Sequence, residues 1–494
     1  MPLRSRLRSI EEYLYLHATN TPEKVAIVVG DQQTDYRSLY EKAYRYHEYL
    51  KGSGVSTGDI VVTRASQTLE YVVVYLAIHM AGGIVTSLEK NLPLAELEKI
   101  AGQLGASFVI PKENEQPTGP WKKLVSPSQI PSGEGYVSLP ILDFPDPEAS
   151  ADILFTTGTT GVSKGVELSH KALVATAENL IFGCEYKPDT FLIVPGPLNH
   201  ANAIRKLFTT LVGGSTLCLL GGMSDLPGFF RALDHPLGRK ACCLPPAAIR
   251  TLFALTGDRI GAYVGKIDFI ESASAPLPES DKARLCRLLP GTRLYNNYGS
   301  SEAASVCMLD YSRYPDQKGC VGKEMPNSRV IIVDDSHREI RSDPDHPGLL
   351  ACMGDVIMKG YVHDPALTKE VLVNGTVYTS DVGYKDSEGF IFITGRKGDV
   401  INVGGIKVSP VEVEEATLSF EGVEDCICIA CPDPITGQAL KLLLVMRPGT
   451  VPDSRALRQF LSARLEAVKV PRLYEQVEKI ARTYNGKLDR KFYR

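Results

Sequence analysis

Short β-branched runs alternate with amphipathic patterns over the first 150 residues of the chain. Strands are predicted at 25–29, 59–63 and 83–87, and helices at 39–51, 66–80 and 94–104. Such alternation is typical of parallel sheets covered by helices. The longest apolar stretch, 71–88, holds His79, Gly82 and Gly83, so we expect a buried helix followed by a strand rather than a membrane span.

The alternation continues beyond residue 150 and then changes character. A strand at 153–155 precedes a polar run at 156–165, and a helix at 170–182 is expected to begin after Ser169, whose hydroxyl suits an N-cap. Between 320 and 394, short strands are separated by Gly, Asp and Pro, which predicts a small antiparallel barrel or sheet.

The residues after Arg396 predict a compact unit of their own. Ser409-Pro410-Val411-Glu412 has the pattern of a capping box with proline at the first helical position, which indicates a helix start. Strands are predicted near 423–431 and 440–446, and a helix near 454–468. The predicted fold class is α/β, with a large N-terminal domain of helix-covered β-sheets at 1–396, a barrel-like subdomain at 320–394 and a small α/β C-terminal domain at 397–494.

Length, charge and cysteine content narrow the class of protein. A chain of 494 residues exceeds the roughly 250–300 at which one core stops growing, so at least two domains are expected. The 54 Lys and Arg against 58 Asp and Glu leave a net charge of −4, which argues against a nucleic-acid partner. The chain has eleven cysteines, an odd number, which does not suggest a set of disulfides. No apolar signal segment follows the basic start, so we expect a reducing, cytoplasmic location without integral membrane association. The basic start fits a surface helix better than a transit peptide.

The polar run 156–165 carries the strongest chemical signal. Its sequence is Thr-Thr-Gly-Thr-Thr-Gly-Val-Ser-Lys-Gly. Glycines free the backbone N–H groups, hydroxyls add donors and Lys164 adds positive charge, a set that suits phosphate oxygens. It is not a P-loop, because glycine follows Lys164 and the residues after it predict a strand rather than a helix.

This loop resembles that of the adenylate-forming superfamily, which includes acyl-CoA and aryl-CoA ligases, luciferases and stand-alone adenylation domains. The chain departs from the usual loop at Thr157, where Ser is common, and at Ser163, where Pro is common. By resemblance the phosphates of ATP contact the loop residues Thr156, Thr157, Gly158, Thr159, Thr160 and Lys164.

A second segment, 295–302, resembles the Asn-x-Tyr-Gly-x-Thr-Glu motif of the same superfamily, with Ser301 for Thr. The resemblance places Asn297, Tyr298 and Gly299 in the nucleotide site, Tyr298 beside the adenine and Ser301 at the α-phosphate. It makes Glu302 the ligand of Mg²⁺, which prefers hard oxygen donors.

Three further segments follow in the order that the superfamily shows. Asp381, in Tyr-Thr-Ser-Asp, resembles the residue that binds the ribose hydroxyls, and Arg396 resembles a second ribose contact. Gly398 stands at the hinge position, where Asp or Lys is usual, and glycine accepts almost any backbone conformation there. Lys487, in Asn-Gly-Lys, resembles the catalytic lysine of a mobile C-terminal domain.

Two groups of residues are assigned by resemblance to the other substrates. Gly404, Gly405 and Lys407 would face the path of the thiol, although a plain β-turn explains Gly404-Gly405 equally well. The acid pocket would be lined by His200, which is also a catalytic candidate, and by Ser272, Ala273, Ser274 and Ser300. Ala201 stands where amino-acid-activating relatives usually have Asp, which argues against an amino-acid substrate.

The resemblance implies an AMP-forming ligase that uses ATP and Mg²⁺ to activate a carboxylic acid and transfers the acyl group to coenzyme A. Side chains at Ala273 and Ser274, where glycines are common, favour a medium-chain or aromatic acid over a very long one. Loading of an acyl-carrier protein through its phosphopantetheine is the main alternative, and a non-catalytic nucleotide-binding regulator is another. A zinc module at Cys426, Cys428 and Cys431 is disfavoured, because these cysteines lie in a strand-like run and suit core packing better.

Overall fold

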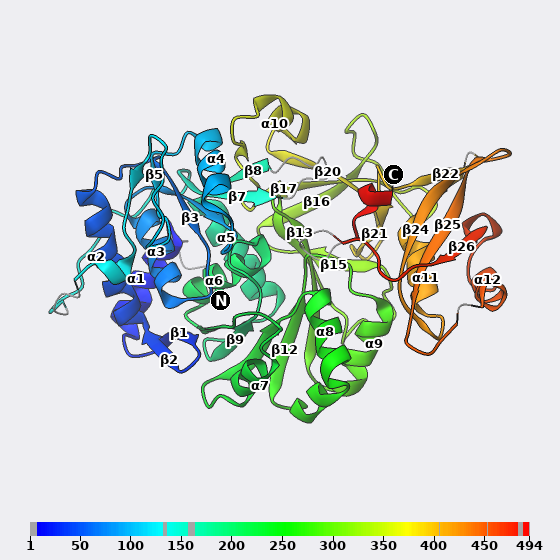
Figure 1. The fold of residues 1–494 in the computed structure, drawn as a ribbon, viewed down its shortest axis with the longest axis horizontal. Helices are drawn as coiled ribbons and strands as arrows, with labels where there is room; N and C mark the ends of the chain where they lie inside the picture. The colour runs from blue at the N-terminus through cyan, green and yellow to red at the C-terminus, as the bar shows by residue number, and fades with distance from the viewer. Residues whose placement is uncertain are drawn as a thin grey trace.

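A computed structural model describes residues 7–131, 136–156, 164–404, 406–451, 453–482 and 488–493. Within these residues the strands form two large sheets and two small ones (Figure 1). No helix in the described part of the chain is long and apolar enough to cross a membrane.

The smaller of the two large sheets is built mainly from the first third of the chain. Its strand order is β18-β8-β7-β4-β3-β5-β6, with β3 to β7 parallel where they pair and with β8 and β18 antiparallel at one end. The bounds are β3 Ile60–Arg64, β4 Ile84–Leu88, β5 Phe108–Val109, β6 Lys122–Lys123, β7 Ser150–Thr156, β8 Lys164–Ser169 and β18 Gly360–Tyr361. Helix α4, Leu94–Leu104, packs on its outer face through Leu97, Ala101 and Leu104.

The larger sheet has a parallel centre, in the order β1-β10-β9-β11-β12-β13. These strands are β1 Val25–Val29, β9 Thr190–Val194, β10 Thr216–Leu219, β11 Arg239–Cys243, β12 Ile267–Ser272 and β13 Arg293–Ser300, with β2, Gln32–Asp35, antiparallel at one edge. Helices α7 Leu226–Asp234, α8 Pro246–Thr256 and α9 Glu279–Leu288 share a core cluster with one face of this sheet.

Antiparallel strands continue this sheet beyond β13, most of them in the region 320–394 where such strands are predicted. They are β14 Ala304–Asp310, β15 Cys320–Glu324, β16 Ser328–Val333, β17 Gly348–Gly354, β20 Thr376–Lys385 and β21 Ile391–Arg396, with the short β19, Leu372–Val373, beside β20 and helix α10, Pro365–Val371, before it. Ser328 Oγ of β16 donates to Val306 O of β14 over 2.9 Å. The strands therefore curl toward a barrel while remaining part of one sheet.

A group of mutually packed helices shares one core cluster with strands of both large sheets. The central ones are α1 Ile10–Asn20, α2 Tyr36–Gly52, α3 Leu69–Met80, α5 His170–Gly183 and α6 Ala201–Gly213. Helix α3 contacts β4 of one sheet and β1 of the other, and α5 contacts β8 and β14 in the same way. Every residue from Tyr71 to Met80 is buried, which confirms the buried helix predicted for the long apolar stretch.

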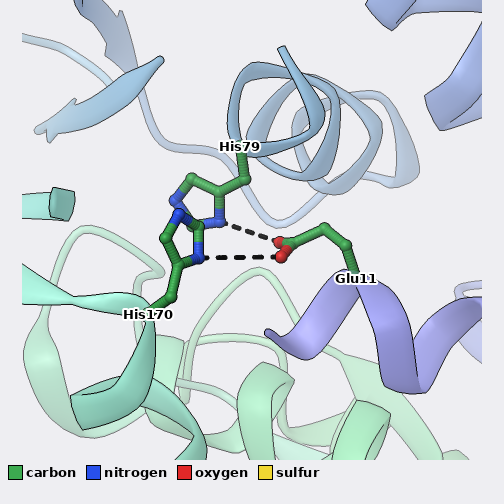
Figure 2. Close-up of side chains that lie close together, drawn as sticks. All are labelled: Glu11, His79 and His170. Atoms are coloured by element: carbon green, nitrogen blue, oxygen red, sulfur yellow. Dashed lines mark hydrogen bonds and ion pairs between the residues drawn. The ribbon is translucent and has the colours of Figure 1, made fainter. Parts of the chain in front are cut away.

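A buried polar cluster connects three of these helices (Figure 2). Both ring nitrogens of His79 on α3 are engaged, with Nδ1 2.9 Å from Glu11 Oε1 on α1 and Nε2 3.1 Å from Asp152 Oδ1 on β7. His170, at the start of α5, has Nδ1 3.8 Å from Glu11 Oε2. Burial by itself would lower the pKa of His79, but the two carboxylates outweigh it and raise this pKa to about 10, whereas burial lowers the pKa of His170 to about 3. His79 is therefore an imidazolium between two carboxylates.

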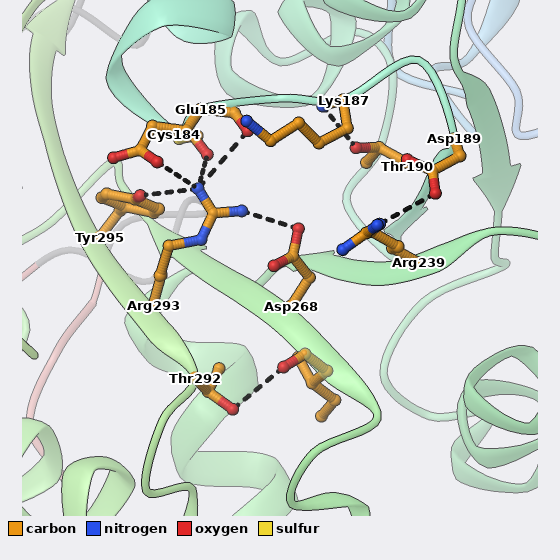
Figure 3. A network of polar contacts seen from close by, with 11 residues as sticks. Cys184, Glu185, Lys187, Asp189, Thr190, Arg239, Asp268, Thr292, Arg293 and Tyr295 are labelled. Carbon is orange, nitrogen blue, oxygen red and sulfur yellow. Dashed lines mark hydrogen bonds and ion pairs between the residues drawn. The ribbon is translucent and has the colours of Figure 1, made fainter.

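A second network fixes the amino ends of the central strands (Figure 3). Arg293, the first residue of β13, donates from Nη2 to Asp268 Oδ2 on β12 over 2.7 Å and from Nη1 to Cys184 O, after α5, over 3.0 Å. Arg239 on β11 donates to Asp189 Oδ2 over 2.9 Å. These contacts lie at the opposite ends of the strands from Asn297 and Ser272, the site candidates on β13 and β12, so they orient the strands without entering the candidate site.

The C-terminal unit has its own sheet and core (Figure 1, orange to red). It contains the hairpin β22 Ile401–Val403 and β23 Ile406–Val408, the sheet β24 Val423–Asp433, β25 Gly437–Met446 and β26 Leu473–Gln476, and helices α11 Pro410–Leu418 and α12 Ser454–Ser462. The predicted helix 454–468 is thus shorter than expected. Helix α11 begins after Ser409 as predicted. Ser409 Oγ makes no capping bond and is buried with no partner among the residues that the structure describes, so the predicted capping box is wrong. Cys426 and Cys428 pack in this core.

Candidate active site

The candidate site lies where the two large sheets meet. β7 ends at Thr156 and β8 begins at Lys164, so the loop candidates Thr157, Gly158, Thr159 and Thr160 lie outside the described residues, as does the side chain of Thr156. The segment before β18 joins the sheets, since Lys359 N–H donates to Glu167 O of β8 and Met358 N–H donates to Glu302 O, each over 2.8 Å. Lys164 and Glu302 are therefore brought to the same edge from positions 138 residues apart (302 − 164).

Tyr361 on β18 contacts both of these candidates. Its Oη donates to Glu302 Oε1 over 2.8 Å, and Lys164 Nζ lies 5.4 Å from the centre of its ring. Burial and the neighbouring Glu302 raise the pKa of Tyr361 far above its ordinary value, so the hydroxyl remains a donor. The sequence interpretation missed Tyr361, because a tyrosine after a glycine in a short strand carries no distinctive pattern.

The turn that holds Glu302 depends on Gly299. A Cβ on Gly299 would lie 1.6 Å from Ala304 O, so no other residue fits without a backbone shift. Ala304 itself has a positive φ of 51°, and Ser300 Oγ accepts from Ala303 N–H over 3.0 Å. Together these contacts make a tight turn from β13 into β14 that exposes Ser301 and Glu302 in part.

Three of the predicted nucleotide residues meet in one hydrogen-bonded group. Tyr298 Oη donates to Asp381 Oδ2 over 2.6 Å, and Arg396 Nε donates to Asp381 Oδ1 over 2.7 Å. Asp381 and Arg396 are also direct partners in the pairing of β20 with β21. The carboxylate of Asp381 raises the pKa of Arg396, which secures its positive charge. The side chain of Asp381 is 10% exposed and that of Arg396 is 43% exposed, so an open face remains beside the pair.

Asn297 lies deeper, at the carboxyl ends of β12 and β13. Its Nδ2 donates to Glu271 Oε1 over 2.8 Å and to Ser305 Oγ over 3.1 Å, whereas its Oδ1 is buried and has no partner among the described residues. Glu271 also receives Lys206 Nζ of α6 at 2.6 Å, and both side chains are fully buried. Consecutive residues of a strand point to opposite faces, so the side chain of Asn297 faces Glu271 and Ser305, whereas that of Tyr298 faces Asp381.

The candidates for the acid pocket surround the start of α6 and the end of β12. His200 is the residue before α6, and its ring does not cap the helix. Ser272 and Ala273 are buried, and Ser272 Oγ has no partner among the described residues. Ser274 is exposed and has a φ of 79°, a conformation that favours glycine. Ser300 O accepts from Arg205 Nη2 of α6 over 2.7 Å.

The sequence interpretation missed Arg205, Lys206 and Glu271. Charged residues of an amphipathic helix usually lie on its solvated face, so the sequence gave no reason to expect that Arg205 and Lys206 are buried. The available signal was the length of the apolar pattern in 201–213, which leaves little room for a solvated face.

The hinge and thiol candidates lie on the C-terminal side of β21. Gly398 is in the turn after Arg396, where Asp399 N–H donates to Arg396 O over 2.9 Å. Gly404 is in the turn of the β22–β23 hairpin, with a φ of 61°, and donates from N–H to Thr436 O over 3.0 Å. Gly405, Lys487 and the side chain of Lys407 lie outside the described residues.

Near the end of the chain, Arg490 bonds to the hinge region and to α11. Its Nη2 lies 2.6 Å from Glu414 Oε2 and its Nε 3.5 Å from Asp399 Oδ2. Burial raises the pKa of Glu414 in spite of this pair. The terminal segment is therefore anchored close to the turn that contains Gly398.

Comparison with known families gives two matches along the chain. Residues 14–362 match the family of AMP-binding enzymes, and residues 412–487 match the AMP-binding enzyme C-terminal domain.

Relatives align with nearly the whole chain. A long-chain-fatty-acid–CoA ligase of Escherichia coli O6:H1 is 27% identical over 538 residues, covering 98% of this chain and 94% of the relative. A feruloyl-CoA synthase of Amycolatopsis sp is 26% identical over 497 residues, covering 95% of each chain.

Solved structures share the fold. ATP-bound MatB from Rhodopseudomonas palustris has a TM-score of 0.86 at 23% identity and covers 98% of both chains. The o-succinylbenzoate CoA synthetase MenE of Bacillus subtilis, in complex with its acyl-adenylate intermediate, has a TM-score of 0.84 at 21% identity and covers 98% of this chain and 97% of that one. The predicted fold class, a large N-terminal α/β domain followed by a small one, is confirmed.

Proposed function

The chain belongs to the adenylate-forming family of AMP-binding enzymes, and we propose that it is an AMP-forming acid–CoA ligase. The observation that carries the proposal is the convergence of Tyr298 with Asp381 and Arg396. Tyr298 lies 83 residues before Asp381, and the three side chains form one group beside the turn of Glu302. The names of the relatives, which are acyl-CoA and feruloyl-CoA ligases, support coenzyme A as the acceptor.

The proposed chemistry follows from the poor reactivity of a carboxylate. Its oxygen attacks the α-phosphorus of ATP, the bond to pyrophosphate breaks, and a mixed anhydride with AMP forms. Both reactants are anionic, so the site has to hold them in line and offset their charge. The thiol of coenzyme A then attacks the acyl carbon, and AMP leaves with the bonding electron pair.

Individual residues are assigned to these tasks as proposals. Asp381 and Arg396 bind the ribose hydroxyls, and Tyr298 flanks the adenine, with Asn297 and Gly299 beside it in the same strand. Ser301 donates to the α-phosphate. Glu302 is the residue that would hold Mg²⁺, which offsets phosphate charge when bound.

Tyr361 has a positioning role in this proposal. Its hydrogen bond to Glu302 fixes one carboxylate oxygen and leaves the other for the metal, and its ring lies beside Lys164. The loop 156–165 supplies further donors to the phosphates.

The C-terminal unit is assigned to the second half of the mechanism. We place the domain boundary at 396/397 and the pivot at Gly398. Lys487 supplies positive charge during adenylation, and Gly404, Gly405 and Lys407 face the thiol after the domain turns.

For the acid, the proposal favours a medium-chain or aromatic substrate over a very long chain. Ala273 is buried at the end of β12, and Ser274 places a side chain in a backbone conformation that glycine adopts freely. Both features would narrow the space left for the acid. Ala201 follows His200 where an amino-acid substrate would need a carboxylate.

ATP–pyrophosphate exchange over a panel of carboxylic acids, each with and without coenzyme A, tests the function. We expect exchange with one class of acid, followed by faster AMP release when coenzyme A is added. Exchange without acceleration by coenzyme A would redirect the acceptor to an acyl-carrier protein. No exchange with any acid would contradict the proposal and favour a non-catalytic nucleotide-binding protein.

A further inference from the structure

The buried cluster of Glu11, His79, Asp152 and His170 contains two polar atoms that its hydrogen bonds do not satisfy. Glu11 Oε2 and His170 Nδ1 face each other over 3.8 Å, which is too far for a hydrogen bond, and neither atom has a hydrogen-bond partner among the described residues. The side chains are 0% and 1% exposed. Figure 2 shows both imidazole rings beside the carboxylate of Glu11. Buried polar atoms without partners are unfavourable, so a bound group between them is favoured.

The charges of this cluster do not balance. Glu11 and Asp152 are two carboxylates, and in the part of the chain that the structure describes their one charged partner is the imidazolium of His79. Burial lowers the pKa of His170 to about 3, so this ring is neutral. One negative charge is therefore left without compensation in the interior, which is costly. A divalent cation held by two neutral histidines would cancel both carboxylates.

The donor atoms have the chemistry of a zinc site. One nitrogen of each histidine and one oxygen of Glu11 lie within 4.8 Å of one another. Donors to one Zn²⁺ ion are about 3–4 Å apart, because each bond is about 2.0–2.2 Å long, so the ion would draw these side chains together by about 1 Å. Imidazole nitrogens suit Zn²⁺, whereas Mg²⁺ prefers oxygen ligands. Each oxygen of Glu11 lies near one of the histidines, so a bidentate carboxylate completes a set of four donor atoms.

The contacts behind His79 also fit a metal ligand. Its Nε2 lies 3.1 Å from Asp152 Oδ1, and Tyr75 Oη donates to Asp152 Oδ2 over 2.6 Å. A metal-bound histidine usually donates its second ring N–H to a carboxylate, which fixes the tautomer and the orientation of the ring. Asp152 would therefore direct His79 Nδ1 toward the ion without being a ligand itself.

We propose that Glu11, His79 and His170 bind one Zn²⁺ ion, with Asp152 as the hydrogen-bond partner of His79. The ion replaces the proton that lies between His79 Nδ1 and Glu11, and this proton is released to solvent. The three ligands come from α1, the last turn of α3 and the first residue of α5. The ion ties these helices together, so its role is structural, and the site shares no residue with the proposed ligase chemistry.

The zinc content of the full-length wild-type protein tests the inference. The protein is produced in minimal medium with added zinc sulfate and dialysed against a weak chelator with excess Mg²⁺, which removes zinc from exposed groups. We expect about one zinc ion per chain by plasma mass spectrometry, and a content below about half an ion would contradict the site. Protein produced without zinc should have a lower Tm, because an ion bound to the folded state stabilises it. Equal Tm values would contradict the structural role.

Single substitutions show whether this cluster holds the zinc. Glu11→Gln and His170→Gln should each lower the zinc content at least tenfold. His346→Gln is the matched control, because His346 Nδ1 lies 3.1 Å from Asp343 Oδ1 on a side chain that is 79% exposed. It removes an exposed pair of the same chemical groups and should keep the full content, as should Glu302→Gln at the proposed Mg²⁺ ligand. Zinc that was lost with either of these two, and kept in the ligand variants, would overturn the inference.

X-ray absorption at the zinc edge keeps the test informative if a ligand variant fails to fold, because it needs only the wild type. The spectrum should show two imidazole ligands and otherwise oxygen. Sulfur ligands would instead place the ion at cysteines such as Cys426 and Cys428, and a spectrum without imidazole would place it at carboxylates. Either result would overturn the inference while leaving the ligase proposal untouched.

Discussion

Asp381→Asn is the sharpest test of the proposed nucleotide site. Asp381 accepts from Tyr298 Oη over 2.6 Å and from Arg396 Nε over 2.7 Å, and these short bonds hold its carboxylate in one orientation. The substitution keeps the shape of the side chain but removes its charge and turns one acceptor oxygen into a donor. We expect it to weaken ATP binding far more than it weakens the fold.

The magnitudes follow from the exposure of the two partners. Hydrogen bonds to a charged group contribute about 1.5–3 kcal/mol, so losing the carboxylate that accepts from the ribose should raise the Kd for ATP by about 10- to 100-fold. The pair with Arg396 contributes little to folding, because the arginine side chain is 43% exposed and such pairs are usually worth up to about 1 kcal/mol. The Tm should therefore fall by only a few degrees.

Calorimetric titration of ATP into wild type and variant measures the first quantity, and a thermal melt measures the second. Asp335→Asn is the matched control: Asp335 Oδ1 lies 2.7 Å from Lys397 Nζ, next to Arg396, on a side chain that is 77% exposed. The control should bind ATP within about twofold of wild type. If folded Asp381→Asn bound ATP within threefold of wild type, the assignment of this group to the ribose would be refuted.

Three further predictions concern the turn, the buried cluster and the catalytic lysine. Gly299→Ala should lower Tm and abolish ATP–pyrophosphate exchange, because the added Cβ would lie 1.6 Å from Ala304 O. Gly52→Ala is the control: no atom lies within 4 Å of the Cβ that it adds, so neither quantity should change. In the metal-free folded protein the pKa of His79 is raised from 6.5 to about 10, so its protonation stabilises the fold fully below pH 6.5 and no longer does so once the pH has risen through 10. The free energy of unfolding, measured with urea, should therefore fall over this pH range. The variant His79→Gln should lack that part of the fall. Lys487→Ala should abolish adenylation but spare thioester formation from supplied acyl-adenylate, and an equal loss in both half-reactions would contradict its role.

Local sequence signals located most of the elements because the forces that set them act over a few residues. Ser169 caps α5 through its hydroxyl, which accepts from Ala172 N–H, as expected for an N-cap serine. The burial of α3 followed from its continuous apolar residues. Where the local signal failed, as at Ser409, the side chain became buried in the surrounding structure instead of bonding to its own helix.

The ordered motifs also identified the family, and the structure then brought distant members together. Tyr298, Asp381 and Arg396 were each named from the sequence, but their mutual hydrogen bonds depend on the pairing of β20 with β21 and on the position of β13. The loop residues 157–163 and Lys487 remain predictions from the sequence, since they lie outside the described residues.

Tyr361, Arg205 and Lys206 show what the sequence by itself did not determine. Helix α6 carries two adjacent cations, and whether they face water or a carboxylate depends on which strand packs opposite them. That strand is β12, which places Glu271 at 2.6 Å from Lys206 and removes both from solvent. The electrostatic environment of a side chain depends on neighbours that are distant in the sequence, so only the tertiary structure decided which charge Lys206 faces.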